Sequence, residues 1–382
     1  MKFNQALERM STYPFVQLED AKRKVADRLG DLIDFGVGDP MERTPEFIRR
    51  ALIESITENS SYPKAAGLPE AREAIADWCR RRFGVEVDAA AEVLPSSGSK
   101  EAIFGLAQIA VDRSADKSIV VTTEPGYPIP LRSAKLNGCH VLTLPLRENL
   151  GFLPDLDSID DATWRRIALF WVNYPNNPTG ATAPVSFYEE LASRALEHDF
   201  LVASDEAYSE IYFGDPPHSA LEVTDRGHVV VFNTLSKRSA MTGYRSGSIV
   251  ADENVMTMFK RYRPIAGTAS PEFIQRAAAA AWRDETHVEE MRSIYGAKRG
   301  VIEPFLRDKG LRVAGGSATF YLWVATPDGE TEDAFALRLL QRGVVVAPGT
   351  FFGEAGRGYV RMALVPALEQ CRKAVDLLDD II

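Results

Sequence analysis

The chain has few of the residues that build disulfides and metal sites. Its three cysteines, Cys79, Cys139 and Cys371, lie far apart in 382 residues, and its five histidines show no ligand spacing. An odd number of scattered cysteines argues against a disulfide framework and favours a reducing compartment. Neither a CxxC pair nor an HExxH motif occurs, so we expect no metal site.

Long apolar runs are missing too. No segment approaches the ~20 apolar residues that span a bilayer, and the N-terminal stretch MKFNQALERMSTYPF has no apolar centre of the kind found in signal peptides. The formal net charge of −10 disfavours nucleic acid and anionic membranes as partners. We therefore expect a cytoplasmic protein without a membrane or nucleic-acid partner.

The middle of the chain alternates apolar runs with helical patterns. Near-continuous apolar runs predict strands that are buried on both faces, at 118–123, 167–173, 200–206, 229–234 and 246–251. Helical periodicity over 100–112 and 186–198 lies between them. This alternation predicts an α/β domain with a mostly parallel sheet, whose ligands bind at the carboxyl ends of the strands.

The pattern changes at about residue 285. A long helix is expected over 285–309, and shorter strands and helices follow at 318–324, 331–342, 344–348, 359–365 and from 367 onward. This part is typical of a smaller α+β domain. We expect 46–284 to form a large domain, 285–382 to form a small domain, and 1–45 to be an N-terminal arm that contributes to the small domain.

Lys237 directly follows one of the predicted strands, in the segment NTLSKRSAMTGYRSG. Partial burial and a nearby cation, here Arg245 or Arg238, lower the pKa of a lysine, and a neutral amine can form a Schiff base. Spacing alone leaves an ordinary loop lysine as the alternative.

Asp205 lies at the end of another predicted strand, in ASDEAY, and Tyr208 follows three residues later. A carboxylate in this position can pair with a protonated pyridine nitrogen and keep the ring cationic, so that the ring acts as an electron sink. An aspartate that only caps a helix is the alternative.

A third segment, SSGSKEA, opens a predicted helix with small residues. Backbone N–H groups at a helix N-terminus bind phosphate, and the helix dipole favours the anion. Simple capping by Ser97 or Ser99 would explain the same residues.

Three more polar side chains complete the set. Asn177 in NYPNNPTG can bond a phenolic oxygen, and Tyr127 in EPGYPIP can stack on a planar ring. Arg361 lies on the apolar strand YVRMAL, where an unpaired charge is costly. A bidentate carboxylate ligand would compensate that cost, as would a structural salt bridge.

Together these motifs resemble the fold type I aminotransferases of classes I and II, which use pyridoxal 5′-phosphate (PLP). The segments GVGDP, YPKAAGLPEAREAIA, SGSKEAI, EPGYP, NYPNNPTG, SDEAY, TLSK with GYRSG, and YVRMAL occur in the family's order along essentially the whole chain. The resemblance implies a large domain with a mostly parallel sheet flanked by helices, a smaller α+β domain, and PLP as cofactor.

The resemblance also implies a role for each residue. Lys237 would be the Schiff-base lysine and proton carrier, Asp205 would hold the pyridine nitrogen, and Tyr208 with Asn177 would bond the phenolic oxygen. The remaining assignments are a phosphate cup of Gly98, Ser99, Lys100, Ser236 and Arg245, ring stacking by Tyr127, and substrate α-carboxylate binding by Arg361, Asn177 and the backbone at Gly38. Tyr62 would reach the phosphate of a partner subunit, which implies a homodimer with shared active sites.

The partners implied are small-molecule substrates, namely amino acids and 2-oxo acids. Around Arg238 and over 267–292 the sequence is similar to N-succinyl-diaminopimelate aminotransferases of lysine biosynthesis, so the leading donor is N-succinyl-LL-2,6-diaminopimelate, with 2-oxoglutarate as acceptor. Arg238 and Arg263 are the candidates for binding the distal carboxylates; the alternatives are that Arg238 points to solvent and that Arg263 only braces its loop.

Other functions share the same cofactor site. An aminotransferase for free diaminopimelate, aspartate or another amino acid has the same motifs. A PLP-dependent C–S β-lyase begins with the same chemistry at Cα. A PLP-binding regulator is a non-enzyme alternative, but such proteins usually carry a DNA-binding domain for which 382 residues leave no room.

Overall fold

A seven-stranded sheet forms the centre of the large domain in the computed structural model, which describes residues 1–10, 14–59 and 61–381. From one edge to the other, its strands are β2 (Val93–Ser96), β8 (Gly247–Ala251), β7 (Val229–Thr234), β6 (Leu201–Asp205), β5 (Ile167–Asn173), β3 (Ile119–Glu124) and β4 (His140–Pro145). All neighbouring pairs are parallel except those of β8, which is antiparallel to β2 and to β7.

The five strands expected from apolar runs all form, and the mostly parallel α/β sheet is confirmed. The two edge strands, β2 and β4, are additional to the prediction. Pro95 interrupts the apolar pattern of β2, and proline is tolerated there because an edge strand need not donate to a ladder on both sides. The apolar runs also did not reveal that β8 reverses direction.

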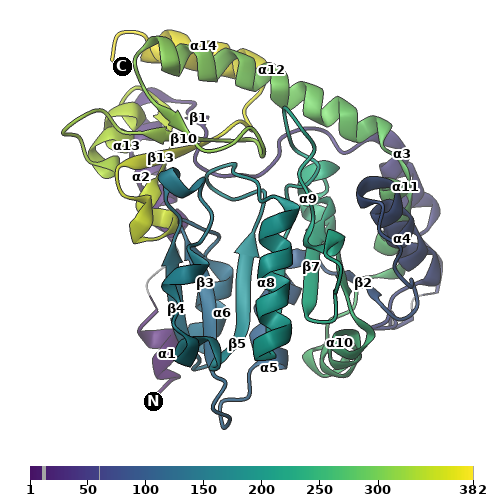
Figure 1. Ribbon diagram of the computed structural model, residues 1–382. Coiled ribbons are helices and arrows are strands. Elements are labelled where there is room, and N and C mark those ends of the chain that lie inside the picture. Colours follow the sequence, from purple (N-terminus) through teal and green to yellow (C-terminus); the bar gives the residue numbers. More distant parts are fainter. Residues whose placement is uncertain (11–13, 60, 382) are drawn as a thin grey trace.

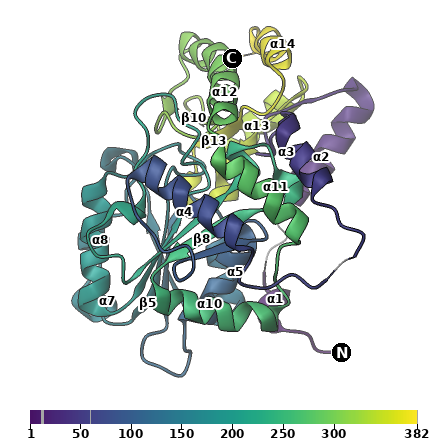
Figure 2. The same cartoon turned by 90° about the vertical axis from the view of Figure 1, so that its right-hand side faces the viewer.

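Helices cover both faces of this sheet (Figures 1 and 2). One face packs on α5 (Ser99–Ala110), α6 (Ile129–Leu136) and α10 (Glu253–Ala266), and the other packs on α4 (Pro69–Phe83), α8 (Val185–His198) and α11 (Glu272–Arg283). In β7, Val230 and Phe232 point to the first face whereas Val229 and Val231 point to the second. Burial on both faces explains why the run is apolar without interruption.

The small domain lies above the sheet in Figure 1. It contains a four-stranded antiparallel sheet in the order β12 (Ala347–Pro348), β13 (Tyr359–Ala363), β10 (Tyr321–Ala325) and β9 (Val313–Ala314), together with α13 (Glu332–Leu340) and α14 (Leu368–Leu378). The long helix α12 (Thr286–Asp308) runs from the large domain to the small one and packs on α14.

The N-terminal segment contacts both domains. The helix α1 (Gln5–Glu8) lies beside α6 of the large domain, and α2 (Pro14–Leu29) leads into β1 (Ile33–Asp34), which pairs in parallel with β11 (Val344–Val345) of the small domain. The short helix α3 (Glu46–Glu54) then packs against α11. Positions 11–13, which fall within the expected 1–45 arm, lie outside the described residues.

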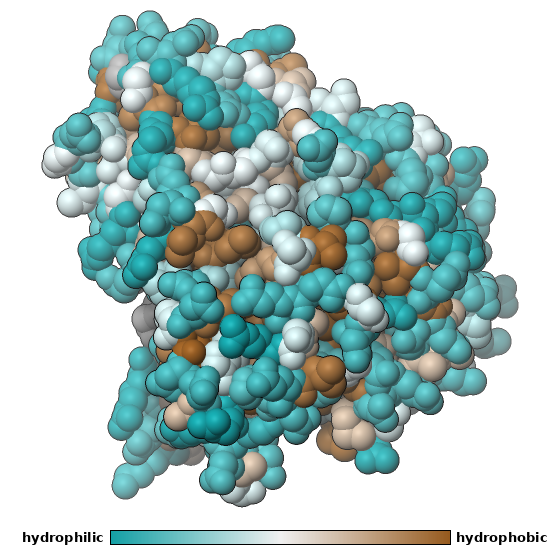
Figure 3. Space-filling model, viewed as in Figure 1, coloured by the Kyte–Doolittle hydropathy of each residue, from teal (hydrophilic) through white to brown (hydrophobic). Residues whose placement is uncertain are grey.

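The face in Figure 3 is mostly hydrophilic, with apolar groups scattered between charged ones. Among the helices of the described residues, none combines the length and the apolar character needed to cross a membrane.

Candidate active site

A pocket of about 710 Å³ opens at the carboxyl ends of β5, β6 and β7, between the two domains. It brings together nearly all of the residues singled out from the sequence: Gly38, Ser99, Lys100, Tyr127, Asn177, Asp205, Tyr208, Ser236, Lys237, Arg245 and Arg361. They come from distant segments of the chain: Gly38 and Arg361 are 323 residues apart in sequence. Among them, Asn177, Tyr208 and Lys237 follow β5, β6 and β7, at the edge where the strand-end rule predicts a ligand.

Lys237 lies on α9 (Leu235–Arg238), the single helical turn that follows β7. Its amine donates to the Gly38 carbonyl oxygen at 2.7 Å and lies 5.7 Å from the centre of the Phe320 ring. Burial lowers the pKa of Lys237 to about 8; the charges of Arg361, Lys100 and Arg245 act in the same direction, and Asp39 opposes them. This amine is more readily neutral, and hence nucleophilic, than an ordinary lysine.

The cationic end of the pocket lies at the N-terminus of α5. Gly98 caps this helix with φ +79°, and a Cβ there would lie 2.4 Å from the Arg245 guanidinium, so only glycine allows this approach. The free N–H groups of the first helical turn and the Arg245 side chain suit a phosphate. Ser236 lines the same end, and so does Thr234, which the sequence analysis did not identify.

At the opposite end, the Asp205 carboxylate is buried and has no ion-pair partner among the described residues. Burial raises the pKa of Asp205 to about 7, against a hydrogen bond from the Ala207 N–H. A protonated ring nitrogen would supply the missing positive charge. Asn173, also not identified from the sequence, donates to the Asp205 carbonyl oxygen and lines the pocket.

Arg361 enters the pocket from β13 of the small domain, and its side chain is almost entirely buried. Its guanidinium donates to the Asn177 side-chain oxygen at 2.9 Å and to the Gly36 carbonyl oxygen at 2.7 Å. It lies 4.2 Å from the centre of the Tyr321 ring and 4.5 Å from that of Phe352. A buried guanidinium that lines the pocket in this way can bind an anionic ligand such as a carboxylate.

Tyr321 is a further pocket residue that the sequence analysis missed, because its strand reads as apolar throughout. Its hydroxyl hydrogen-bonds to the Tyr208 hydroxyl at 2.6 Å. A Cβ on Gly38 would lie 2.2 Å from this same hydroxyl, which explains the glycine. Asp39 lines the mouth of the pocket beside it.

The expectation that Arg238 and Arg263 bind distal substrate carboxylates is wrong, because neither lines the pocket. Arg238 is buried against the rings of Trp282 and Trp78 and donates to Glu285. The sequence shows that Arg238 adjoins Lys237, but consecutive side chains point in different directions.

Arg263 instead supports the helix at the cationic end. It is buried on α10, donates to the Pro95 carbonyl oxygen at 2.6 Å and pairs with Glu101 at 3.2 Å. Glu101 in turn accepts the Ser97 N–H at the start of α5. The ion pair therefore holds the end of β2 against α5.

Tyr62 does not reach the pocket of its own chain. Its side chain is fully exposed (100%), in the segment before α4. The prediction that Tyr62 serves a partner's site stays a prediction.

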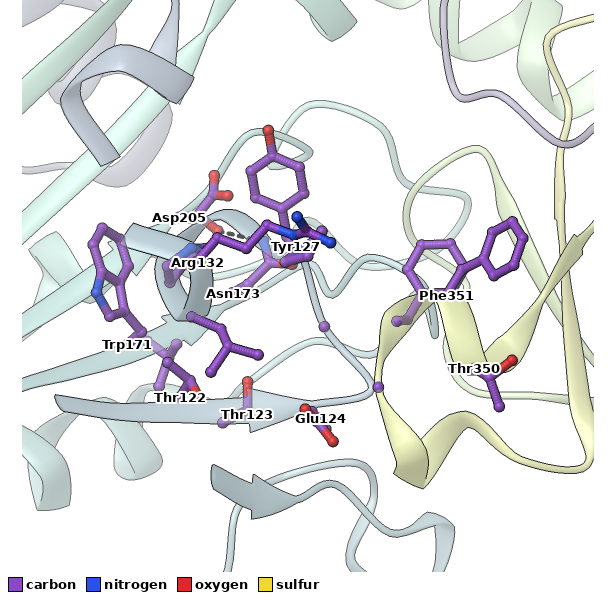
Figure 4. A pocket seen from close by; sticks show the side chains of 17 residues that line it. Thr122, Thr123, Glu124, Tyr127, Arg132, Trp171, Asn173, Asp205, Thr350 and Phe351 are labelled. Carbon is purple, nitrogen blue, oxygen red and sulfur yellow. Dashed lines mark hydrogen bonds between the residues drawn. The ribbon is translucent and has the colours of Figure 1, made fainter. Parts of the chain in front are cut away.

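A second cavity of about 170 Å³ adjoins the first and shares Tyr127, Asn173 and Asp205 with it. Figure 4 shows Tyr127 and Arg132 of the large domain on one side, and Phe351 and Thr350 of the small domain on the other. The domains are hydrogen-bonded here, since the Gly126 N–H donates to the Phe352 carbonyl oxygen at 2.9 Å. This cavity thus lies at the domain boundary, beside the cofactor pocket.

Residues 30–378 match the family model described as "Aminotransferase class I and II". The chain belongs to this family. This aminotransferase is therefore a PLP-dependent transaminase, whose substrates are amino acids and 2-oxo acids. Its pocket fits PLP on structural grounds, because cations and helical N–H groups lie at one end, and the buried Asp205 carboxylate, which has no ion-pair partner in the part of the chain that the structure describes, lies at the other.

Curated relatives and solved structures agree with this family. The aminotransferase is 36% identical to an LL-diaminopimelate aminotransferase of Dehalococcoides mccartyi, over 98% of this chain and 97% of the relative. A crystal structure of an aminotransferase from Neisseria meningitidis has a TM-score of 0.93 at 35% identity and covers 100% of both chains. A probable N-succinyldiaminopimelate aminotransferase from Thermus thermophilus has a TM-score of 0.88 at 29% identity, with 96% of this chain and 100% of that chain covered.

Proposed function

We propose that this aminotransferase moves the α-amino group of a diaminopimelate-type donor to 2-oxoglutarate. The observation that carries the proposal is a pocket with a buried arginine, Arg361, for the α-carboxylate and a second cationic side chain, Lys100, for a distal one. Whole-length similarity to a diaminopimelate aminotransferase supports the same donor class.

Within this proposal, Lys237 is the residue that moves the proton. PLP, when bound, supplies the electron sink that acidifies the substrate Cα–H. The Lys237 amine takes this proton, because its pKa of about 8 gives it a larger neutral fraction near neutral pH than an ordinary lysine has. Arg361 holds the α-carboxylate in bidentate fashion and so fixes the direction of the Cα–H bond.

Lys100 replaces Arg238 and Arg263 as the candidate for a distal carboxylate. Its side chain lines the pocket. Burial and the Arg245 charge lower the pKa of Lys100, and a carboxylate bound beside the amine would oppose this shift and favour the charged form. Its backbone N–H belongs to the first turn of α5, so the backbone can serve the phosphate while the side chain serves the substrate.

The first candidate donor is N-succinyl-LL-2,6-diaminopimelate, which carries its distal carboxylates on a neutral amide arm. Free LL-diaminopimelate is the second, and Asp39 favours it. This carboxylate lines the pocket, where its charge acts on Lys237, and a distal ammonium group of the donor would find an opposite charge there.

A donor screen with 2-oxoglutarate as acceptor tests the proposal. N-succinyl-diaminopimelate, free diaminopimelate, aspartate, alanine and phenylalanine are compared by kcat/KM. A clear preference for alanine or phenylalanine would reject the diaminopimelate class and leave the transaminase assignment intact. Assay of pyruvate and ammonia released from cystathionine separates amino transfer from β-elimination.

Two variants of Lys100 locate the distal contact. Lys100→Met should lower kcat/KM for the long dicarboxylic donor by about 10- to 100-fold, the cost of a lost charged contact, but change that for alanine little. Lys100→Arg is the matched control and should retain most of the preference. An equal loss for both donors in Lys100→Met would assign the lysine to the cofactor phosphate instead.

We also propose a homodimer with composite active sites. The support is Tyr62, which matches a family tyrosine in sequence but is remote from its own pocket and fully exposed. An exposed tyrosine that belongs to an active site must belong to that of another chain.

A further inference from the structure

Arg238 and Ser239, the two residues after Lys237, attach its helical turn to the segment 284–287. Arg238 contacts Asp284 and Glu285 at the junction between α11 and α12. Ser239, the residue after it, ends α9 and is completely buried. Its hydroxyl lies 2.8 Å from Nε2 of His287, in the first turn of α12.

His287 continues this contact to a carboxylate. Its Nδ1 lies 2.6 Å from Oδ1 of Asp284, and the same oxygen accepts the His287 backbone N–H at 3.0 Å. Burial, together with the nearby Arg238 charge, lowers the pKa of His287 against the effect of Asp284, which favours the neutral imidazole. The ring also packs edge-on against Phe47 of α3.

The chemistry of the three groups fixes the direction of the hydrogen bonds. An ionised carboxylate only accepts, so Nδ1 of His287 must carry the proton that it donates to Asp284. Nε2 of a neutral ring then has a lone pair and accepts the hydroxyl proton of Ser239. The chain runs in one direction, from Ser239 through His287 to Asp284.

A serine, a histidine and an aspartate in this order also occur in hydrolases, but the environment here excludes a nucleophilic serine. Ser239 is 0% exposed and lies outside both cavities that adjoin the cofactor site. No substrate can approach its oxygen. The hydroxyl is therefore used for attachment, two residues from an amine that must be held accurately.

We infer that Ser239 and His287 are positioning residues for Lys237, and that the hydrogen bonds from Ser239 to Asp284 fix the turn from which the lysine amine reaches the substrate. The inference rests on the proposed role of Lys237. It extends that role to residues with no contact to substrate or cofactor, and it links the turn to α12, the helix that joins the two domains.

The first step of the test examines Lys237 itself. The PLP-loaded protein is reduced with borohydride and the modified lysine is located by peptide mapping. A label on another lysine overturns the proposed site, whatever the variants show. A label on Lys237 leaves the positioning role to be decided separately.

The second step is a double-mutant cycle of Ser239→Ala, His287→Phe and the double variant. Phenylalanine is chosen at position 287 because it keeps a ring packed on Phe47. Ser239→Ala leaves His287 Nε2 without its partner, and His287→Phe leaves the Ser239 hydroxyl without its partner, so each single variant should lower Tm. The double variant removes both groups and should recover most of the lost Tm. The rate of a single half-reaction should behave differently. We expect it to fall by roughly 10- to 100-fold in all three variants, because the turn is released in each.

A readout on the cofactor-free protein completes the test. Competitive acetylation with mass spectrometry measures the pKa of Lys237, which should move from about 8 toward the ordinary lysine value when the turn loosens. Ser219→Ala is the matched control: Ser219 is equally buried and caps the short helix Ala220–Glu222 outside the pocket, so this change should lower Tm only.

Recovery of both Tm and rate in the double variant would overturn the inference, because the chain would then be merely structural. Unchanged rates and an unchanged Lys237 pKa in all variants would overturn it as well. If His287→Phe does not fold, Ser239→Ala and His287→Gln, whose amide oxygen can still accept the hydroxyl proton, decide the question.

Discussion

The hydroxyl oxygens of Tyr208 and Tyr321 lie 2.6 Å apart and join the loop after β6 in the large domain to β10 in the small domain. Both rings are buried, and burial raises the pKa of each hydroxyl, so both stay protonated and one donates to the other. The Tyr321 ring also contacts the Arg361 guanidinium. Tyr321 thereby holds Tyr208, which is assigned to the cofactor, at a fixed distance from Arg361, which is assigned to the substrate.

Gly38→Ala should raise KM for every amino donor, because the new Cβ would lie 2.2 Å from the Tyr321 hydroxyl and displace the backbone beside Arg361. The double variant Gly38→Ala/Tyr321→Phe removes the closest atom and should recover part of the loss. Steady-state kinetics with glutamate as donor measure both. A double variant no better than the single one would mean that the clash is not the cause.

The cofactor-free protein should take up PLP faster as the pH rises. Burial lowers the pKa of Lys237 to about 8, so the neutral amine that attacks the aldehyde increases as the pH rises through 8 and levels off above it. An ordinary lysine would still be gaining near pH 10. Stopped-flow absorbance measures the rate, and Lys237→Ala should show no imine band. A midpoint near 10 would contradict the lowered pKa.

Asp205→Ala should cost far more activity than cofactor affinity. The carboxylate stabilises the protonated ring, whereas the phosphate is held at the other end of the pocket by α5 and Arg245. We expect the half-reaction to slow by about 10²- to 10³-fold, as when one preorganised electrostatic partner is removed. Equilibrium dialysis gives the PLP affinity for comparison. Half-reaction rates equal to those of the wild type would remove Asp205 from this role.

Mixing two inactive proteins should restore activity if sites are shared between subunits. In a hybrid dimer, one subunit carries Tyr62→Phe and the other carries Lys237→Ala. One of its two sites then combines Lys237 of the first subunit with Tyr62 of the second and is free of both substitutions. The measurement is specific activity after unfolding and refolding the mixture, with each variant refolded alone as control. A fully active monomer in sedimentation equilibrium would reject the composite site.

Arg238→Met and Arg263→Ala should reduce stability without changing substrate preference. Both side chains are buried away from the pocket, and Arg263→Ala leaves Glu101 without its partner, which costs about 3–5 kcal/mol for a buried pair. Denaturant unfolding measures the loss. A change in the ratio of kcat/KM between long and short donors would return these arginines to the substrate site.

Much of the fold can be predicted from the sequence because burial on both faces leaves a strong pattern. The run from Val229 to Phe232 is apolar for that reason, and its strand, 229–234, is predicted with the observed bounds. The direction of β8 could not be predicted in this way, because an apolar run looks the same in either orientation. The edge strand β4 also escaped prediction, since its outer residue His140 is exposed.

The site could be predicted only where a residue type and its place after a strand coincide. Lys237 and Asp205 satisfy both conditions and line one pocket in the structure. Arg238 satisfies both conditions as well, yet its side chain is buried against Trp78 and Trp282, outside the pocket. These two tryptophans lie on helices that are distant from Arg238 in sequence, so the sequence pattern does not reveal the contacts. Tyr321 shows the opposite case, because a phenol that faces the pocket on an apolar strand resembles a core residue.

The antiparallel direction of β8 also determines where the chain can change in length. Thr234, the last residue of β7, is paired with Gly247, the first residue of β8. The segment 235–246 therefore leaves the sheet and returns to it at the same end of these two strands. Its two ends are fixed, so a single inserted residue would displace either Lys237 from Gly38 or Arg245 from Gly98. The connection from β6 to β7 must cross the sheet and is less constrained. Insertions and deletions should therefore be tolerated at the exposed positions 214–216 of this connection and eliminated between 235 and 246.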